Sequence, residues 1–93
     1  MASDPVYRSL ELTPTFLADL ISNDFTATDR KRFLQVLRLL DTNDQHPSLR
    51  VHALQGKLKG TWTVSASGEL RITFIRLGDS RKLIQSCSRH YQQ

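Results

Sequence analysis

Three side chains in the second half of the chain have the chemistry needed for acid–base work on a phosphate. His52 lies within the stretch VHALQGKLKGTW, Arg71 within LRITF, and His90 near the C-terminal end. Histidine exchanges a proton near neutral pH and can act as a general acid or base. Arginine keeps its charge and can bind a phosphate through two hydrogen bonds. The alternatives are structural: a partly buried His52 bonded to backbone, and His90 as an ordinary strand end.

Two lysines flank Leu58 in the first of these stretches. On a short extended segment Lys57 and Lys59 would point the same way, which suits phosphate contact but also plain solvation. The chain has three histidines, one cysteine (Cys87) and no cluster of acids, so neither a zinc site nor an internal disulfide is expected. It also has no P-loop, dinucleotide fingerprint or nucleophile elbow, and no cofactor is expected.

Charge is unevenly distributed along the chain. Residues 1–49 hold five basic and seven acidic side chains, whereas residues 50–93 hold eight basic and two acidic ones. A basic half on a small protein suggests a polyanionic partner, most simply nucleic acid. A solvated basic surface fits the same numbers, and charge alone does not separate the two.

Length and composition indicate one globular domain that spans residues 1–93. A chain of 93 residues buries about 60–65% of its unfolded surface, enough for one modest core. Its 39% of hydrophobic and 24% of charged residues are typical of a folded protein. The N-terminus has no signal-peptide pattern, and no apolar run has the length of a membrane span. We therefore expect a cytoplasmic protein that has no membrane partner.

The first half of the chain predicts a short strand and two helices. Alternation over residues 6–12 indicates the strand. Thr13 and Pro14 suit the N-cap and first position of a helix, whose apolar stripe would be Leu17, Leu20 and Ile21. A second helix starts near residues 26–28, and its buried face follows the spacing i, i+3, i+4, i+7, at Phe33, Val36, Leu37 and Leu40.

The second half predicts three strands, and the turn between the first two fixes their register. A two-residue turn at positions 67–68 would place a polar side chain on the core face. A three-residue turn, 67–69, pairs Ala66 with Leu70 and keeps the apolar side chains of both strands on one face. The core side chains of this pair would include Trp62, Val64, Ile72 and Phe74.

Simple alternation in the last strand puts Leu83 and Cys87 on the core side and Ile84 on the opposite side. The predicted fold is therefore α+β, in the order β-α-α-β-β-β, with two N-terminal helices packed on one face of an antiparallel sheet. The uncovered face would carry serine and threonine hydroxyls, which are common on solvated faces. Arg71 and His90 on the same face, with Glu69 at the adjoining turn, are more suggestive of a site.

Three stretches resemble the RelE/ParE superfamily of type II toxins, closest to the YafQ- and YoeB-like mRNA interferases. They are HPSLRVHALQGKLKGTW, LRITF and the closing SCSRHY, and the resemblance extends from about Leu10 to Tyr91. It implies a RelE-like fold and a ribosome-dependent mRNA endonuclease that blocks translation. It also implies a cognate antitoxin as partner, besides the ribosome and mRNA, with the toxin a monomer or dimer within the antitoxin complex.

The resemblance assigns roles to individual residues. His52 falls where YafQ-like toxins have a catalytic histidine and YoeB-like toxins a general-base glutamate. Arg71 falls at the phosphate-binding arginine of the family. His90 and Tyr91 fall at the terminal His-Tyr pair of YoeB-like toxins, and Glu69 falls near an acidic residue of the YafQ type. The side chains expected to bind RNA are Lys57, Lys59 and Arg89.

Such a site would cut RNA without a metal. A base removes the 2′-OH proton, a cation stabilises the dianionic phosphorane, and an acid protonates the leaving 5′-oxygen, which yields a 2′,3′-cyclic phosphate. A further histidine of the YafQ type is Ser65 here, so the base is either His52 or another group. Two alternatives stay open: a ParE-like gyrase inhibitor, and a non-catalytic RNA- or protein-binding homologue.

Overall fold

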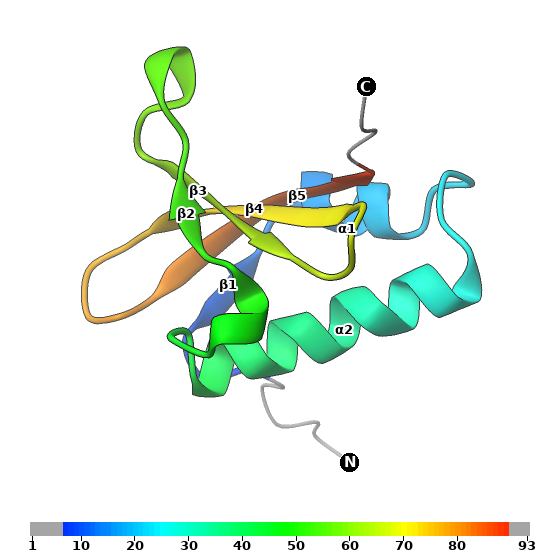
Figure 1. Ribbon diagram of the computed structural model, residues 1–93, viewed down its shortest axis with the longest axis horizontal. Coiled ribbons are helices and arrows are strands. Elements are labelled where there is room, and N and C mark those ends of the chain that lie inside the picture. The colour runs from blue at the N-terminus through cyan, green and yellow to red at the C-terminus, as the bar shows by residue number, and fades with distance from the viewer. Residues whose placement is uncertain (1–6, 90–93) are drawn as a thin grey trace.

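A mixed five-stranded sheet with two helices forms the body of the molecule (Figure 1). The computed structural model describes residues 7–89. In chain order the elements are β1 (Leu10–Leu12), α1 (Pro14–Leu20), α2 (Ala27–Thr42), β2 (His52–Ala53), β3 (Thr61–Ser65), β4 (Leu70–Arg76) and β5 (Lys82–Arg89). Short 3₁₀ helices at Pro47–Leu49 and Gly56–Leu58 flank β2.

The strands are arranged in the order β1-β5-β4-β3-β2. β1 runs parallel to β5, and every other neighbouring pair is antiparallel. The predicted α+β class and the order β-α-α-β-β-β are confirmed, and β2 is an additional strand. Its two residues are too few for a periodic pattern to reveal, because alternation needs about four residues to be recognised.

Both helices begin at threonine caps: Thr13, as predicted, and Thr26, within the range where the second helix was expected to start. The Oγ1 of Thr13 accepts a hydrogen bond from the Phe16 N–H at 3.0 Å, and Pro14 occupies the first helical position. Thr26 and Asp29 form a reciprocal capping box at the start of α2, with both hydrogen bonds at 3.0 Å. These bonds satisfy N–H groups that would otherwise have no partner at a helix start.

One apolar core lies between the helices and the sheet. Its fully buried members are Phe16 of α1, Phe33, Leu37 and Leu40 of α2, Leu49, and Val64, Leu70, Ile72, Phe74 and Ile84 of the sheet. Val36 and Trp62 pack against this cluster and are partly buried. The predicted buried face of α2 is thus confirmed, as is the packing of both helices on the Trp62 face of the sheet.

The predicted apolar stripe of α1 is confirmed only at Leu20, which packs against the core, and is wrong at Leu17 and Ile21. Phe16 is the buried side chain, whereas Leu17 is 45% exposed and Ile21 is 74% exposed. α1 has only seven residues, too few turns for apolar spacing to fix which side faces the core. Its orientation is instead set by the backbone N–H and Oγ1 of Thr13, which donate to the Ile84 carbonyl at 3.1 and 2.9 Å.

The predicted β3–β4 register is confirmed. Val64 lies opposite Ile72 and Ser65 lies opposite Arg71. The Ala66 N–H donates to the Leu70 carbonyl at 2.8 Å, which closes the three-residue turn. Arg71 therefore lies on the face away from the helices, because neighbouring residues of a strand point to opposite faces.

A bulge in β5 corrects the predicted faces of that strand. Ile72 lies opposite Cys87, but Phe74 lies opposite Ile84, so one residue of β5 is skipped near Gln85. An extra residue reverses the alternation beyond it. Ile84 is consequently fully buried in the core, and its predicted place on the uncovered face is wrong; Leu83, predicted for the core, falls on the other side.

Two aspartates at the end of α2 connect the helix to the sheet. Asp41 accepts from the backbone N–H groups of Arg8 and Ser9 at 3.0 and 2.6 Å. Burial alone would raise the pKa of Asp41, but these bonds outweigh it and hold the pKa below its ordinary value. Asp44 lies 3.4 Å from the Nζ of buried Lys82. Burial would raise the pKa of Asp44, but the charges and hydrogen bonds of Lys82 and Arg76 together outweigh it and lower the pKa.

Among residues 7–89, no helix is long and apolar enough to cross a membrane. Within the same residues, no group of three or more histidine, cysteine, aspartate or glutamate side chains is placed to hold a metal ion.

Candidate nucleic-acid interface

A row of polar side chains crosses the uncovered face of the sheet. His52 of β2 lies opposite Thr63 of β3, which lies opposite Thr73 of β4, which in turn lies opposite Ser86 of β5. The hydroxyls of Thr73 and Ser86 are hydrogen-bonded to each other. The row lies on the face away from the helices, because the residues on either side of Thr73 point into the core. We call this surface the open face.

His52 is exposed at the end of this row. Its Nδ1 lies 3.4 Å from the Arg50 carbonyl oxygen. With the ring proton on Nδ1, that nitrogen donates to the carbonyl and Nε2 is left as an acceptor for a substrate proton. The structural alternative of a partly buried histidine is therefore wrong, although the histidine does contact backbone.

Arg71 lies on the open face between Ser65 and Ser88 of the neighbouring strands. Its Nη1 donates to the carbonyl oxygens of Ser67 at 2.8 Å and Leu70 at 3.0 Å. These bonds fix one edge of the guanidinium group against the β3–β4 turn. Within residues 7–89 Arg71 has no ion-pair partner, so its charge and its remaining N–H groups can serve a ligand.

The spacing between His52 and Arg71 suits a substrate that bridges them. They lie on β2 and β4, two strands apart, which is about 10 Å across a sheet with strands about 4.8 Å apart. Arg71 is also two residues beyond the row that contains His52, or about 7 Å along the strand. The Arg71 guanidinium is bonded to carbonyl oxygens at the β3–β4 turn, so a substrate that contacts both side chains has to span this distance.

The lysines Lys57 and Lys59 lie on a loop that projects from the sheet between β2 and β3 (Figure 1). The expected extended segment is wrong here, because Gly56–Leu58 form a 3₁₀ helix that begins at a positive φ of 71° at Gly56. Both lysines are exposed, and Leu58 between them is 57% exposed. The loop therefore presents two cations and an apolar side chain beyond the edge of the open face.

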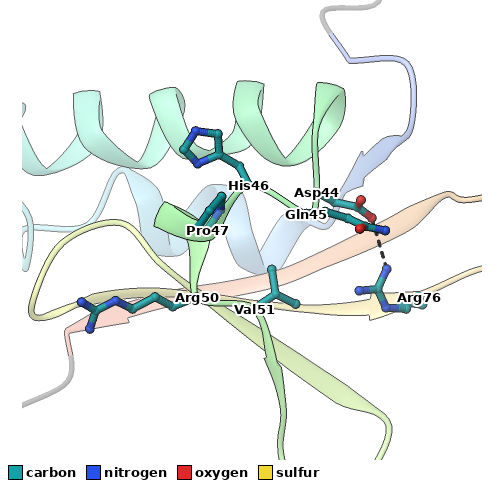
Figure 2. A pocket seen from close by; sticks show the side chains of 7 residues that line it. All are labelled: Asp44, Gln45, His46, Pro47, Arg50, Val51 and Arg76. Carbon is teal, nitrogen blue, oxygen red and sulfur yellow. Dashed lines mark hydrogen bonds and ion pairs between the residues drawn. The ribbon is translucent and has the colours of Figure 1, made fainter.

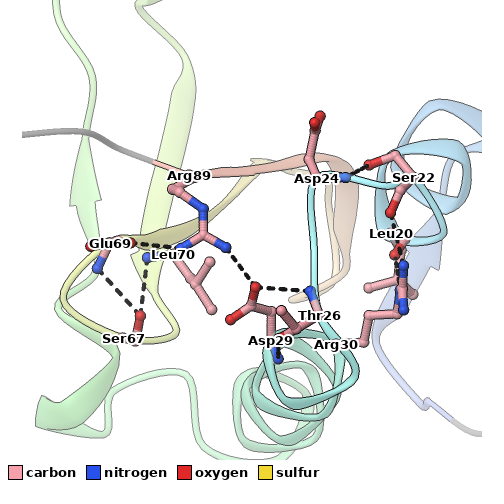
Figure 3. Close-up of polar contacts among 10 residues, drawn as sticks. All are labelled: Leu20, Ser22, Asp24, Thr26, Asp29, Arg30, Ser67, Glu69, Leu70 and Arg89. Carbon is pink, nitrogen blue, oxygen red and sulfur yellow. Dashed lines mark hydrogen bonds and ion pairs between the residues drawn. The ribbon is translucent and has the colours of Figure 1, made fainter.

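Arg89 and Glu69 form an ion pair on the helix side of the sheet (Figure 3). Arg89 lies opposite Leu70, a core residue. Its Nη1 donates to Glu69 Oε2 at 2.6 Å and its Nη2 to Asp29 Oδ2 at 2.5 Å. The hydrogen bonds that Arg89 donates to the Glu69 and Asp29 carboxylates raise the pKa of its guanidinium. In this structure Arg89 thus binds two protein carboxylates and joins β5 to the start of α2.

Solved structures of toxins share this arrangement of strands and helices. The YoeB/ParE toxin from Agrobacterium tumefaciens superposes with a TM-score of 0.72 at 19% identity, over 90% of this chain and 100% of that toxin. The chain has a RelE/ParE-like toxin fold.

Two further structures extend the likeness. A chain of the E. coli DinJ-YafQ toxin-antitoxin complex has a TM-score of 0.70 at 18% identity, with 91% of this chain and 94% of that chain covered. A chain of the Staphylococcus aureus YoeB-YefM complex has a TM-score of 0.67 at 20% identity, with 88% and 95% covered. No protein-family model and no curated protein matches the sequence. The YafQ/YoeB-like toxin fold expected from the three sequence stretches is confirmed.

On this toxin fold the structure brings together some of the expected site residues. His52 and Arg71 share the open face, and Lys57 and Lys59 lie on the adjoining loop. Glu69 lies at the β3–β4 turn but is paired with Arg89. The remaining two expected residues, His90 and Tyr91, lie outside the described residues.

Sequence reasoning missed Arg50. This arginine is exposed and lies two residues before His52, and it lines a hollow that Arg71 also lines. The only signal in the sequence is a basic residue two positions from a candidate catalytic histidine, in LRVH. Such a signal is weak because basic residues are spread through the second half of the chain.

Proposed function

We propose that this protein is the toxin of a toxin–antitoxin pair and an endoribonuclease that cuts ribosome-bound mRNA without a metal ion. The observation that carries the proposal is that His52 and Arg71 share the open face. His52 is exposed, and Arg71 has no ion-pair partner within residues 7–89. The toxin fold supports it, because solved structures with this fold include a YoeB/ParE toxin and a chain of the DinJ-YafQ toxin-antitoxin complex.

In this proposal His52 is the general base. Its Nε2 accepts the 2′-OH proton while the Nδ1–H bond to the Arg50 carbonyl holds the ring in place. The resulting 2′-oxygen attacks the adjacent phosphorus and forms a phosphorane with two negative charges. Arg71 binds this group through the N–H groups that the β3–β4 turn does not use. Because the charge is larger in the transition state than in the substrate, the arginine accelerates the reaction as well as binding RNA.

The leaving 5′-oxygen needs a proton, and His90 is the proposed donor. The P–O5′ bond breaks as that proton is transferred, and the products are a 2′,3′-cyclic phosphate and a 5′-OH. Tyr91 provides a ring on which an unstacked base can lie. Lys57 and Lys59 hold flanking phosphates through charge, a contribution that weakens as salt rises.

The proposed protein partner is an antitoxin that binds the open face. YafQ and YoeB have been solved in toxin–antitoxin complexes with DinJ and YefM. We propose that a cognate antitoxin covers the basic open face here with acidic or apolar side chains, since an active toxin must be kept silent. The substrate, mRNA on the ribosome, places the reaction in the cytoplasm.

End mapping on programmed ribosomes tests the proposed activity. Purified wild-type protein should cut the mRNA only when ribosomes are present and should leave 2′,3′-cyclic phosphate ends. The rate should be unchanged when EDTA is added with magnesium held constant for the ribosome. Uncut mRNA together with inhibition of gyrase supercoiling would support the ParE-like alternative. Uncut mRNA and unaffected gyrase would support a non-catalytic binding homologue.

A further inference from the structure

A hollow of about 390 Å³ lies where Arg50, the end of β3 and the β3–β4 turn meet. Its polar lining consists of two arginines, Arg50 and Arg71, and three serines, Ser48, Ser65 and Ser67. We call it the two-arginine hollow. Its volume lies in the range of about 300–1,000 Å³ that is usual for small-ligand sites, and it adjoins the open face through Arg71 and Ser65.

The charge of the two-arginine hollow is not balanced by its lining. None of its lining side chains is acidic, and within residues 7–89 neither Arg50 nor Arg71 has an ion-pair partner. The neighbouring hollow, which Arg50 also borders, differs because it contains Asp44. Figure 2 shows Asp44 paired with Arg76, while the Arg50 side chain extends away from both.

Serine hydroxyls supply neutral donors beside the two cations. The Oγ of Ser67 accepts from the backbone N–H of Leu70 at 3.2 Å and of Glu69 at 3.3 Å. Because its acceptor positions are taken up by backbone, its own hydroxyl proton is left to donate. Arginines with hydroxyl donors and no competing carboxylate are the groups that bind a phosphate.

The backbone at Arg50 has a conformation that is unusual for an arginine. Arg50 ends the Pro47–Leu49 helix with φ 48° and ψ 52°, in the left-handed region. Glycine and asparagine adopt this conformation with less strain than arginine does. Strained backbone of this kind clusters at functional sites, and here it directs the arginine toward the two-arginine hollow.

We propose that the two-arginine hollow is a second phosphate subsite, which binds the backbone phosphate of a nucleotide next to the cleaved one. The inference rests on the proposed function for the identity of the anion, a phosphodiester of single-stranded RNA. Arg71 borders both the open face and the hollow, so in this proposal it lies beside both phosphates. Arg50 binds only the second phosphate, so it sets how the strand is held and takes no part in bond breaking.

The variant that tests the subsite is Arg50→Asn, since asparagine accepts the left-handed backbone and removes the charge. Arg38→Gln on α2 is the matched control, because Arg38 is exposed and borders a different hollow, away from Val36, the α2 residue that lines the two-arginine hollow. The probe is a short single-stranded RNA with 2′-O-methyl groups, which cannot be cleaved. Arg50→Asn should weaken its binding by about tenfold at low salt. It should also reduce the salt slope by about 0.7, the share of one phosphate on a single strand.

The midpoint of thermal unfolding separates this result from a folding defect. Arg50→Asn should keep or raise the midpoint, since the backbone strain is relieved, and Arg38→Gln should leave binding and slope unchanged. Equal slopes for wild type and Arg50→Asn, or no measurable binding by wild type at low salt, overturn the subsite.

Failure of the subsite and failure of the proposed function give different results. If wild type cuts ribosome-bound mRNA and Arg50→Asn has the same salt slope of RNA binding as wild type, the subsite alone is refuted. A slope that depends on Arg50, in a wild type that leaves mRNA uncut, supports the subsite and refutes the endonuclease.

Discussion

The bulge in β5 predicts a large difference in stability between two adjacent truncations. Ile84 is fully buried in the core, whereas Leu83 falls on the other side of the sheet and is partly exposed. Ile84→Ala removes about three methylene equivalents, or about 2.4 kcal/mol of transfer free energy. The cavity that remains adds to this, so the expected loss is about 3–4 kcal/mol. Leu83→Ala should cost about 1 kcal/mol or less.

Urea unfolding followed by tryptophan fluorescence measures both variants, since Trp62 packs against the core. At about 4–8 °C per kcal/mol for a domain of this size, Ile84→Ala should also lower the unfolding temperature by roughly 12–30 °C. Simple alternation along β5 predicts instead that Leu83→Ala loses more stability than Ile84→Ala. A larger loss for Leu83→Ala than for Ile84→Ala would refute the bulge, and with it the faces assigned to β5.

Three other predictions concern pH, thiol chemistry and RNA binding. Asp41 and Asp44 have lowered pKa values, so the stability that they contribute is complete above about pH 5 and is lost as pH falls through the folded values. The urea midpoint should therefore fall between about pH 5 and pH 2, and a constant midpoint would contradict it. Burial and then Asp19 raise the pKa of Cys87 to about 12, so iodoacetamide should label the folded protein at least about a hundredfold more slowly than the urea-unfolded one; equal rates would count against the buried thiol. Lys57→Ala should leave the unfolding midpoint unchanged and reduce the salt slope of RNA binding by about 0.7 if it contacts one phosphate, whereas an unchanged slope would remove it from the interface.

Helix periodicity, helix caps and turn length were enough to predict the parts of the fold that depend on neighbouring residues. The face of α2 is repeated over several turns, and the Thr13 and Thr26 caps are specified by neighbouring residues. The β3–β4 register follows from the turn, since only a three-residue turn keeps the apolar side chains together. The prediction that Arg71 lies on the open face is therefore correct.

The remaining features depend on contacts between distant segments. The bulge near Gln85 inserts a residue that alternation cannot reveal. The orientation of α1 is set by bonds from Thr13 to β5, 71 residues away in the sequence. Arg89 meets Asp29 only after β5 has packed beside α2. The two-arginine hollow likewise requires Arg50 and Arg71 to be brought together by the sheet.

The most direct test of the proposed function is single-turnover cleavage of mRNA on programmed ribosomes by His52→Ala and wild type. His46→Asn is the matched control, because His46 is exposed in a loop and asparagine can still accept from the Ser48 N–H that His46 caps at 3.1 Å. Removal of a general base costs about 10²–10⁴ in rate, so His52→Ala should slow cleavage by that factor, with unchanged unfolding, while His46→Asn cuts as wild type does. Cleavage by His52→Ala at the wild-type rate would contradict the proposed role of the open-face histidine.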